Sequence, residues 1–177
     1  MQNKILLHAC CAICSAYPIQ HLIDLDYSPV VYFYNPNIFP QAEYNKRLEA
    51  QIKLCEYYNC ELIQGEYLPE KYVDYVKGYE KEPEGGLRCN LCFDMRLKVT
   101  AKKAKELGID NFTTSIVISP HKNFDKISEI GMNVSAVYGI TYVAINFRKK
   151  DGFLKTNKIA NGLGLYRQNY CGCQYSL

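Results

Sequence analysis

The sequence predicts an α/β fold with a mostly parallel sheet of about five strands covered by helices. Two features of the chain lead to this prediction. Short apolar runs rich in β-branched and aromatic residues alternate with longer stretches whose apolar residues recur at helical spacing. Strands and helices that alternate in this way form a parallel sheet with helices on both faces. In such sheets ligands bind beyond the carboxyl ends of the strands.

Each expected strand is a short run of apolar residues that stops at a loop signal. The second strand, for example, ends at the turn sequence Asn35-Pro36-Asn37. In chain order the five expected strands are 5–9, 29–34, 60–64, 112–117 and 142–147.

Each expected helix has apolar residues at intervals of three and four. The helix over 90–107 stops at Gly108 and would place Cys89 and Cys92 at its first turn. At that position the free backbone N–H groups and the helix dipole favour thiolate over thiol. In chain order the expected helices are about 15–25, 41–58, 69–79, 90–107 and 122–138, with a short one after 152.

Seven of the nine cysteines lie in three tight groups that are far apart in the sequence. These groups are Cys10, Cys11 and Cys14; Cys89 and Cys92; and Cys171 and Cys173. Two-residue spacing lets two thiolates converge on one ion or one cluster edge. Seven thiols exceed what one tetrahedral zinc ion binds, so a four-cysteine cluster would leave three for a second metal or for redox chemistry. Cys55 and Cys60 are expected to pack in the core.

Length, charge and missing motifs narrow the classes of function. A chain of 177 residues, 48% of them hydrophobic, suits one compact domain spanning 1–177. No stretch approaches the roughly 20 apolar residues of a membrane span. The N-terminal apolar run is too short for a signal peptide, so we expect a reducing, cytoplasmic location and no membrane partner. A net charge of +3 permits a nucleic-acid partner without requiring one.

The motifs of several common enzyme classes are absent. The chain has no GxxxxGK[ST] phosphate loop, no GxGxxG dinucleotide loop, no HExxH zinc helix and no GxSxG elbow. These absences argue against the nucleotide-binding, metalloprotease and serine hydrolase classes that carry them.

Seven short stretches of the chain resemble the QueH family of epoxyqueuosine reductases. They occur in the family's order and span nearly the whole chain, and the C-terminal block together with the double cysteine is the specific part. The stretches are LLHACCA at 6–12, YNPNI at 34–38, RCNLCF at 88–93, FTTS at 112–115, SPHK at 119–122, KKDGF at 149–153 and GLYRQNYCGC at 164–173.

The resemblance implies a single Rossmann-like (HUP-like) domain with the cysteine site at the carboxyl edge of the strands. It also implies an activity, the reduction of epoxyqueuosine at the wobble position of the tRNA anticodon to queuosine, the last step of that modification. The family's cofactors are a 4Fe-4S cluster and an adjacent mononuclear iron, without cobalamin. Turning an epoxide into an alkene requires two electrons, protons and a Lewis acid for the leaving oxygen, so an external electron donor is expected.

Under this interpretation the cysteines divide between two metal sites. The expected cluster ligands are Cys10, Cys89, Cys92 and Cys171. The expected ligands or close neighbours of the second metal are Cys11, Cys14 and Cys173. Which of Cys10 and Cys11 belongs to which site stays open, because adjacent residues point in different directions.

Catalysis also requires a proton donor and contacts to the tRNA. The titratable residues near the cysteine groups in sequence are His8, Asp94, His121 and Tyr170. We take His121, together with Cys11 and Cys14, as the catalytic candidates, because histidine exchanges protons most easily near neutrality. The expected phosphate contacts are Lys122, Arg148, Lys149, Lys150 and Arg167. Tyr34 and Tyr166 are candidates for stacking on the target base.

Three other functions use the same cysteines. A zinc-stabilised RNA-binding module without catalysis would be colourless. A thiol-disulfide oxidoreductase built on Cys89 and Cys92 would be active without metal. A cluster protein that only relays electrons to a partner would be coloured but inert on tRNA.

Overall fold

The computed structural model describes residues 3–177, and at its centre is a five-stranded sheet in which every strand pair is parallel. The strands are β1 (Asn3–His8), β2 (Tyr27–Phe33), β3 (Leu62–Gln64), β4 (Asn111–Thr114) and β5 (Thr141–Tyr142). Their order in the sheet is β3-β2-β1-β4-β5, so the chain first extends the sheet on one side of β1 and then on the other. The change of side falls between β1 and β4, where a ligand site is expected in this class of sheet.

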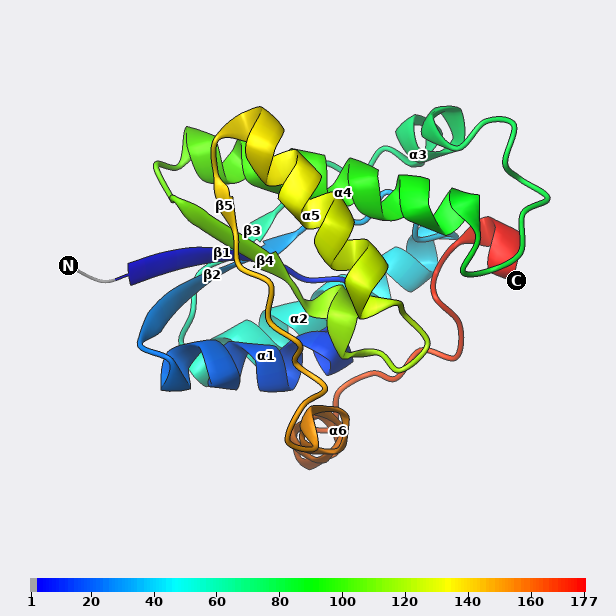
Figure 1. Ribbon diagram of the computed structural model, residues 1–177. Coiled ribbons are helices and arrows are strands. Elements are labelled where there is room, and N and C mark those ends of the chain that lie inside the picture. The colour runs from blue at the N-terminus through cyan, green and yellow to red at the C-terminus, as the bar shows by residue number, and fades with distance from the viewer. Residues whose placement is uncertain (1–2) are drawn as a thin grey trace.

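Helices cover both faces of the sheet (Figure 1). α4 (Leu87–Glu106) and α5 (Phe124–Tyr138) lie on one face, and α1 (Ala12–Asp24) and α2 (Gln41–Tyr58) lie on the other. Two smaller helices extend these layers. α6 (Gly152–Gly162) packs against α1, and α3 (Pro69–Tyr75) packs against α4. Figure 1 shows the start of α4 beside the C-terminal tail, at the carboxyl edge of the strands.

The central strand is apolar on both sides because helices cover both faces. Ile5, Leu6 and Leu7 of β1 are all fully buried, an unbroken run rather than an alternation. Burying each of these side chains contributes about 1.5–3 kcal/mol to the free energy of folding. No described helix combines the length and apolarity that crossing a membrane requires.

The expected fold class and order of elements are confirmed, but several boundaries differ. α1 begins at Ala12 instead of about residue 15, and α3 ends at Tyr75 instead of about residue 79. The strand expected over 112–117 ends at Thr114, because its hydroxyl accepts a hydrogen bond from the Ile116 N–H at 3.2 Å and starts a 3-10 turn, η1 (Ser115–Ile118). The strand expected over 142–147 pairs only at Thr141–Tyr142. α4 begins at Leu87 instead of Asn90, which puts Cys89 in its first turn and Cys92 in its second.

Candidate metal centre

The first cysteine group lies where β1 ends and α1 begins. Cys11 is the N-cap residue of α1, and its sulfur accepts a hydrogen bond from the Cys14 N–H at 3.4 Å. The Cys10, Cys11 and Cys14 sulfurs all lie within 4.8 Å of one another. Thiolates on one tetrahedral ion with metal–sulfur bonds of about 2.3 Å are separated by about 3.8 Å. Within residues 3–177, no other three His, Cys, Asp or Glu side chains come this close together.

Contact among these three thiols determines which one loses its proton. Hydrogen bonds from Cys11 and Cys14 lower the pKa of Cys10 well below its ordinary value. Contacts with Cys10 and Cys11 raise the pKa of Cys14, and contact with Cys10 together with burial raises that of Cys11 to about 12. The hydroxyl of Ser115, at the start of η1, lies 3.5 Å from the Cys10 sulfur and also accepts from the Cys10 N–H. Cys10 is therefore the thiol of this group that is ready to bind a cation.

The second group lies at the start of α4. The Cys89 sulfur accepts a hydrogen bond from the Gly85 N–H at 3.2 Å. Burial raises the pKa of Cys92 to about 11. Cys92 lies in the second turn of α4, beyond the first turn in which the helix dipole mainly acts, so the dipole does not offset the effect of burial there.

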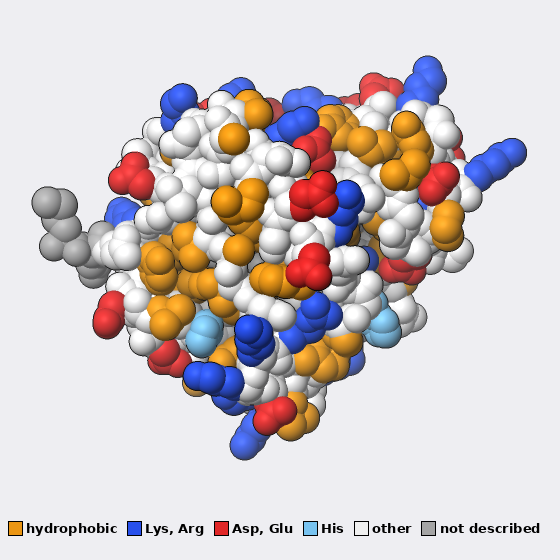
Figure 2. Space-filling model, in the orientation of Figure 1, with side chains coloured by type: hydrophobic (Ala, Val, Ile, Leu, Met, Phe, Trp, Pro, Cys, Tyr) orange, Lys and Arg blue, Asp and Glu red, His pale blue; other side chains and the backbone are white. Residues whose placement is uncertain are grey.

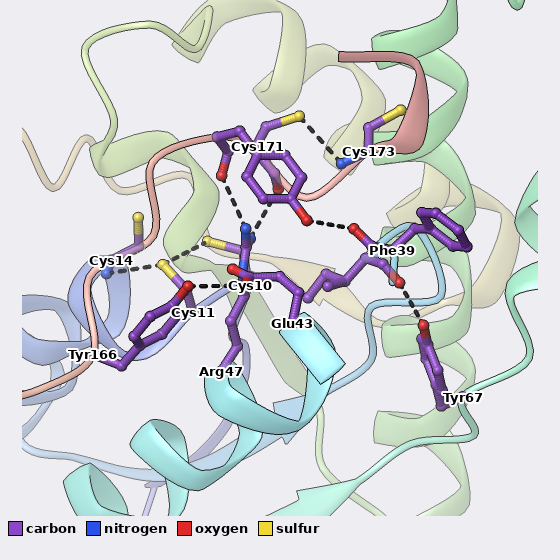
Figure 3. A network of polar contacts seen from close by, with 12 residues as sticks. Cys10, Cys11, Cys14, Phe39, Glu43, Arg47, Tyr67, Tyr166, Cys171 and Cys173 are labelled. Atoms are coloured by element: carbon purple, nitrogen blue, oxygen red, sulfur yellow. Dashed lines mark hydrogen bonds and ion pairs between the residues drawn. The ribbon is translucent and has the colours of Figure 1, made fainter. Parts of the chain in front are cut away.

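The third group is carried by the C-terminal tail, which α2 holds in place (Figure 3). Arg47 donates hydrogen bonds to the carbonyl oxygens of Tyr170 and Cys171 at 2.9 and 3.0 Å. The Arg47 Nε atom also pairs with Glu43 at 2.8 Å. The Tyr166 hydroxyl donates to the other Glu43 oxygen at 2.7 Å. The tail is thus bound to one buried ion pair on α2.

A glycine lets the tail pass close to α2. Gly172 has φ +107, and a Cβ atom there would lie 2.9 Å from Arg47 Nη1 and 3.0 Å from Ile38. The Gly172 carbonyl accepts a hydrogen bond from the Phe39 N–H at 2.8 Å. This close passage buries Cys173, whose sulfur lies 3.0 Å from the Tyr72 hydroxyl.

One thiol from each group lies near Arg96, a buried residue one turn after Cys92 on α4. Burial opposes the charge on Arg96, but the neighbouring thiolates of Cys92, Cys10 and Cys171 raise its pKa above the ordinary value. The structure therefore brings the three sequence-distant groups around one guanidinium. How the seven thiols divide between a cluster and a second metal stays a prediction.

A basic pocket lies next to this site. It has a volume of about 440 Å³ and is lined by the segment 120–125 with Asn146 and Arg148. His121 is exposed there, and Lys122 lies 5.8 Å from the Phe93 ring centroid and 3.7 Å from Glu84. Arg148 donates to the Ser119 carbonyl at 3.4 Å. The catalytic candidate His121 and two of the expected phosphate contacts, Lys122 and Arg148, therefore share one pocket.

The remaining predicted tRNA contacts lie on exposed segments. Lys149 and Lys150 are exposed in the loop before α6. Arg167 is exposed on the tail and donates to Asn161 at 3.1 Å. Figure 2 shows Lys and Arg side chains over the lower part of the visible face, where Figure 1 places α6 and the segment before it.

Comparison with known proteins identifies the family. Residues 5–177 match the family described as "Epoxyqueuosine reductase QueH". The chain belongs to this family. The resemblance drawn from the sequence is therefore confirmed, and with it the activity: the protein is an epoxyqueuosine reductase, an oxidoreductase.

Individual members of the QueH family match along almost the full length of the chain. The QueH protein of Streptococcus pyogenes serotype M1 is 40% identical over 99% of this chain and 71% of its own length. That of Staphylococcus epidermidis is 41% identical over 98% and 76%. That of Thermotoga maritima is 38% identical over 99% and 91%.

A solved structure shares the fold. The U34-tRNA thiolase NcsA from Methanococcus maripaludis, determined with its 4Fe-4S cluster, superposes with a TM-score of 0.59 at 16% identity. The similarity covers 99% of this chain and 62% of that one. At this identity the match shows a common fold, and it does not by itself assign a ligand to this QueH member.

Two residues considered from the sequence have structural roles. His8 is buried and its ring nitrogens contact Thr114 Oγ1 at 3.0 Å and the Tyr34 carbonyl at 2.9 Å. Burial lowers the pKa of His8 to about 4, so the ring is neutral near pH 7 and is not a proton donor. Tyr34 is 5% exposed with its ring stacked on Tyr32, so its predicted stacking on a base is wrong.

The residues that sequence reasoning missed are those that organise the thiols. Arg47, Tyr72 and Arg96 belong to no recognised motif, and each acts through contacts with distant parts of the chain. Only Arg96 leaves a local signal, because it follows Cys92 by four residues and so shares its face of the helix.

Proposed function

We propose that this QueH member reduces the epoxide of epoxyqueuosine in the tRNA wobble position, using a 4Fe-4S cluster, an adjacent mononuclear iron and electrons from an external donor. The observation that carries the proposal is that one thiol from each of the three groups, Cys10, Cys92 and Cys171, interacts with the buried Arg96. Family membership supports the tRNA substrate. The unit of function is the whole domain, 1–177. The reducing cytoplasm suits it, because all nine cysteines are free.

The donor set of the site fits both metal groups. Thiolates are the usual ligands of iron–sulfur clusters. In this proposal the cluster is held by Cys10, Cys89, Cys92 and Cys171. Three of these thiols, those of Cys10, Cys92 and Cys171, raise the pKa of Arg96, and this shared neighbour supports the choice. The second iron is assigned to Cys11, Cys14 and Cys173, whether as direct ligands or as its immediate surroundings.

The close spacing of the first cysteine group supports two metal sites side by side. Cys10 contacts Cys11 and Cys14 and also interacts electrostatically with Arg96. These contacts favour Cys10 over Cys11 as the cluster ligand. When bound, the cluster supplies single electrons and the iron supplies a Lewis acid for the epoxide oxygen.

The chain itself supplies a proton and shields the site. We assign the proton donor to His121, which is exposed in the basic pocket and can exchange protons with water. The 3-10 turn η1, which begins at Ser115, precedes His121 by only a few residues. Because the Ser115 hydroxyl contacts the Cys10 sulfur, this short segment supports a position for His121 near the proposed metals. The tail bearing Cys171 packs over the site and leaves Cys10, Cys14 and Cys171 half-buried.

The basic side chains bind the tRNA backbone in this proposal. The phosphate contacts are Lys122, Arg148, Lys149, Lys150 and Arg167. Each of these side chains is either exposed or lines the basic pocket, so its charge is available to a phosphate. Contacts with phosphates provide most of the sequence-independent affinity of nucleic-acid binding. An anticodon base is already single-stranded, so it reaches the site at little cost. Tyr166 remains a candidate for stacking on that base.

Anaerobic purification followed by metal analysis tests the proposal. Iron, zinc and acid-labile sulfide per chain are measured together with the visible spectrum. We expect about five irons and about four sulfides per chain, as a cubane cluster plus one iron requires. The loaded protein should then convert epoxyqueuosine in tRNA to queuosine when given a chemical reductant. Zinc without sulfide, even after anaerobic reconstitution, would instead indicate the zinc-stabilised RNA-binding module.

A further inference from the structure

Arg96 is a buried cation that has no carboxylate partner. Its side chain lies on α4, and the residue is 6% exposed. Throughout residues 3–177, no Asp or Glu lies within ion-pair distance of it. Arg47, which is also buried, has Glu43 as its partner. The fold therefore pairs the buried Arg47 with an acid and leaves the buried Arg96 without one.

The contacts of Arg96 fix its position without neutralising it. Its Nε atom donates to the Cys92 carbonyl at 3.4 Å, and Nη1 donates to Asn35 Oδ1 at 3.3 Å. The Asn35 amide donates in turn to the Ala9 carbonyl at 2.8 Å, next to the first cysteine group. The guanidinium therefore lies between α4 and the ends of strands β1 and β2, and its hydrogen-bond partners are all neutral.

A buried charge without an anion strongly destabilises a fold. A guanidinium does not escape this cost by losing its proton, because arginine stays charged in proteins. The groups around Arg96 that can become negative are Cys92, Cys10, Cys171 and Tyr72. The three cysteines become thiolates when they bind a metal. The missing anion is therefore the metal-loaded thiolate site.

Arg88 shows the contrast within the same helix. It is also buried, and it neighbours Cys173 and Cys89. Its Nη atoms, however, are used to hold carbonyl oxygens of the 80–82 loop and the Ser176 hydroxyl. Arg88 therefore holds the loop and the tail, whereas Arg96 donates to the Cys92 carbonyl and Asn35 Oδ1 and interacts electrostatically with one thiol from each of the three groups.

We propose that Arg96 is the fixed counter-charge of the cluster site and raises the reduction potential of the cluster. The inference rests on the proposed function, because it requires the cluster. Reduction adds one negative charge beside a fixed positive charge in a buried, weakly screened site, and this attraction favours the reduced state. Arg96 acts through the thiolates and is a positioning and electrostatic residue rather than a group that touches substrate.

The reduction potential of the cluster-loaded full chain tests the proposal. Wild type, Arg96→Gln, Arg96→Lys and Lys103→Gln are compared by anaerobic redox titration. We expect Arg96→Gln to lower the equilibrium constant for reduction at least tenfold, which is about 59 mV more negative for a one-electron couple. Arg96→Lys keeps the charge and should restore most of the shift. Lys103→Gln removes the same charge from the far end of α4 and should leave the potential unchanged.

The outcomes separate this inference from the proposed function. A wild type that holds no cluster after anaerobic reconstitution refutes the proposed function and this inference with it. A loaded wild type whose potential equals that of Arg96→Gln refutes the inference alone.

A second variant covers the case in which Arg96→Gln takes up no cluster. In the metal-free protein, Arg96→Met removes an uncompensated charge while keeping an apolar stem, so the unfolding midpoint should stay the same or rise. If Arg96→Gln takes up no cluster while the metal-free Arg96→Met protein keeps the wild-type unfolding midpoint, the counter-charge role is supported. A clearly lowered midpoint would mean that Arg96 serves the fold instead, and would overturn the proposal.

Discussion

At the scale of single residues, the site requires side chains that general stability rules would not select. The N-cap position of α1 holds Cys11, although Ser, Thr, Asp and Asn are the preferred N-caps. Its sulfur accepts the hydrogen bond that a hydroxyl or carboxylate would normally accept. The same sulfur lies 4.0 Å from that of Cys10. Cys11 therefore couples the start of a helix to the thiol site, and local stability is subordinate to function here.

Cys14 offers a test of the proposed division of ligands. It touches Cys10 and Cys11 but is not among the thiols near Arg96. Replacing Cys14 with Ala should therefore remove about one iron per chain and leave the sulfide content and the cluster absorbance unchanged. Iron and sulfide analysis with visible spectroscopy measures this. Cys60→Ala, outside the three groups, is the control. Loss of the whole cluster in Cys14→Ala would contradict the assignment.

Gly172 offers a second test at this scale. An Ala at this position would be strained by φ +107 and would clash with Arg47. We expect Gly172→Ala to lower the free energy of unfolding by about 1–3 kcal/mol and to reduce metal content by displacing Cys171 and Cys173. Gly164→Ala is the matched control, because Gly164 also has a positive φ, +61, but nothing lies within 4 Å of its Cβ position. Equal metal loss in the two variants would show that contact with Arg47 is unimportant.

At the scale of elements, the tail depends on an ion pair in α2. Burial opposes ionisation of Glu43, but hydrogen bonds from Tyr166 and Arg47 hold its pKa below the ordinary value of 4.5. The unfolded chain therefore takes up a proton at Glu43 at higher pH than the folded protein does. The stabilisation is fully present above the ordinary pKa, and it is lost as the pH falls through the lower pKa of the folded state.

Glu43→Gln should make this pH dependence visible. Near neutral pH we expect the variant to be less stable by about 1.5–3 kcal/mol, the usual value of hydrogen bonds to a charged group. The gap between the two proteins should narrow below about pH 4.5, because protonation then neutralises Glu43 in the wild type. Urea unfolding at several pH values measures the gap. A gap that stays constant down to acid pH would show that the charge of Glu43 does not hold the tail.

The sequence predicted the elements well where periodicity is strong and poorly where pairing is long-range. α2 was predicted with the bounds that it has, because its apolar face repeats over many residues. β5 was predicted too long, since its apolar composition does not reveal that its neighbour β4 offers few residues for pairing. β4 is short because Thr114 caps the turn that follows it. Such limits arise from tertiary structure and leave little trace in local composition.

The candidate site was predictable to the extent that it is built from cysteine spacing. The three thiol groups, and the position of the first of them after β1, follow from residue type and order. The supporting residues do not, since an isolated Arg or Tyr has no spacing pattern. Arg96 acquires its role only when Cys10 and Cys171 are folded next to it.

At the scale of the whole molecule, metal chemistry and positive charge share one side of the protein. The net charge is only +3, so attraction for a polyanion depends on where the basic residues lie. Lys122 and Arg148 line the basic pocket, and the exposed Lys149 and Lys150 follow directly in the chain. These basic residues therefore place positive charge close to the site that the thiols form.

Salt-dependent binding tests this surface. Replacing Lys149 and Lys150 with Gln should weaken tRNA binding and reduce the slope of log affinity against log salt by about 1.5, because each phosphate that a lysine neutralises adds about 0.7–0.9 to that slope. The control replaces Lys102 and Lys105, two exposed residues near the other end of α4, with Gln. It removes the same charge from the opposite edge of the sheet. Equal slopes in the two double variants would refute a specific role for the loop before α6.

The position of Cys171 in the chain has a consequence for how the protein matures in the cell. Ribosomes add about 5–20 residues per second, so roughly 8–30 seconds separate the synthesis of Cys10 from that of Cys171. During that interval the thiols of the first two groups exist without the tail that completes and covers their site. In the proposed function, complete metal loading therefore follows the synthesis of the tail. Until then, the nascent chain depends on its surroundings to keep five of its seven clustered thiols reduced and free of the wrong metal.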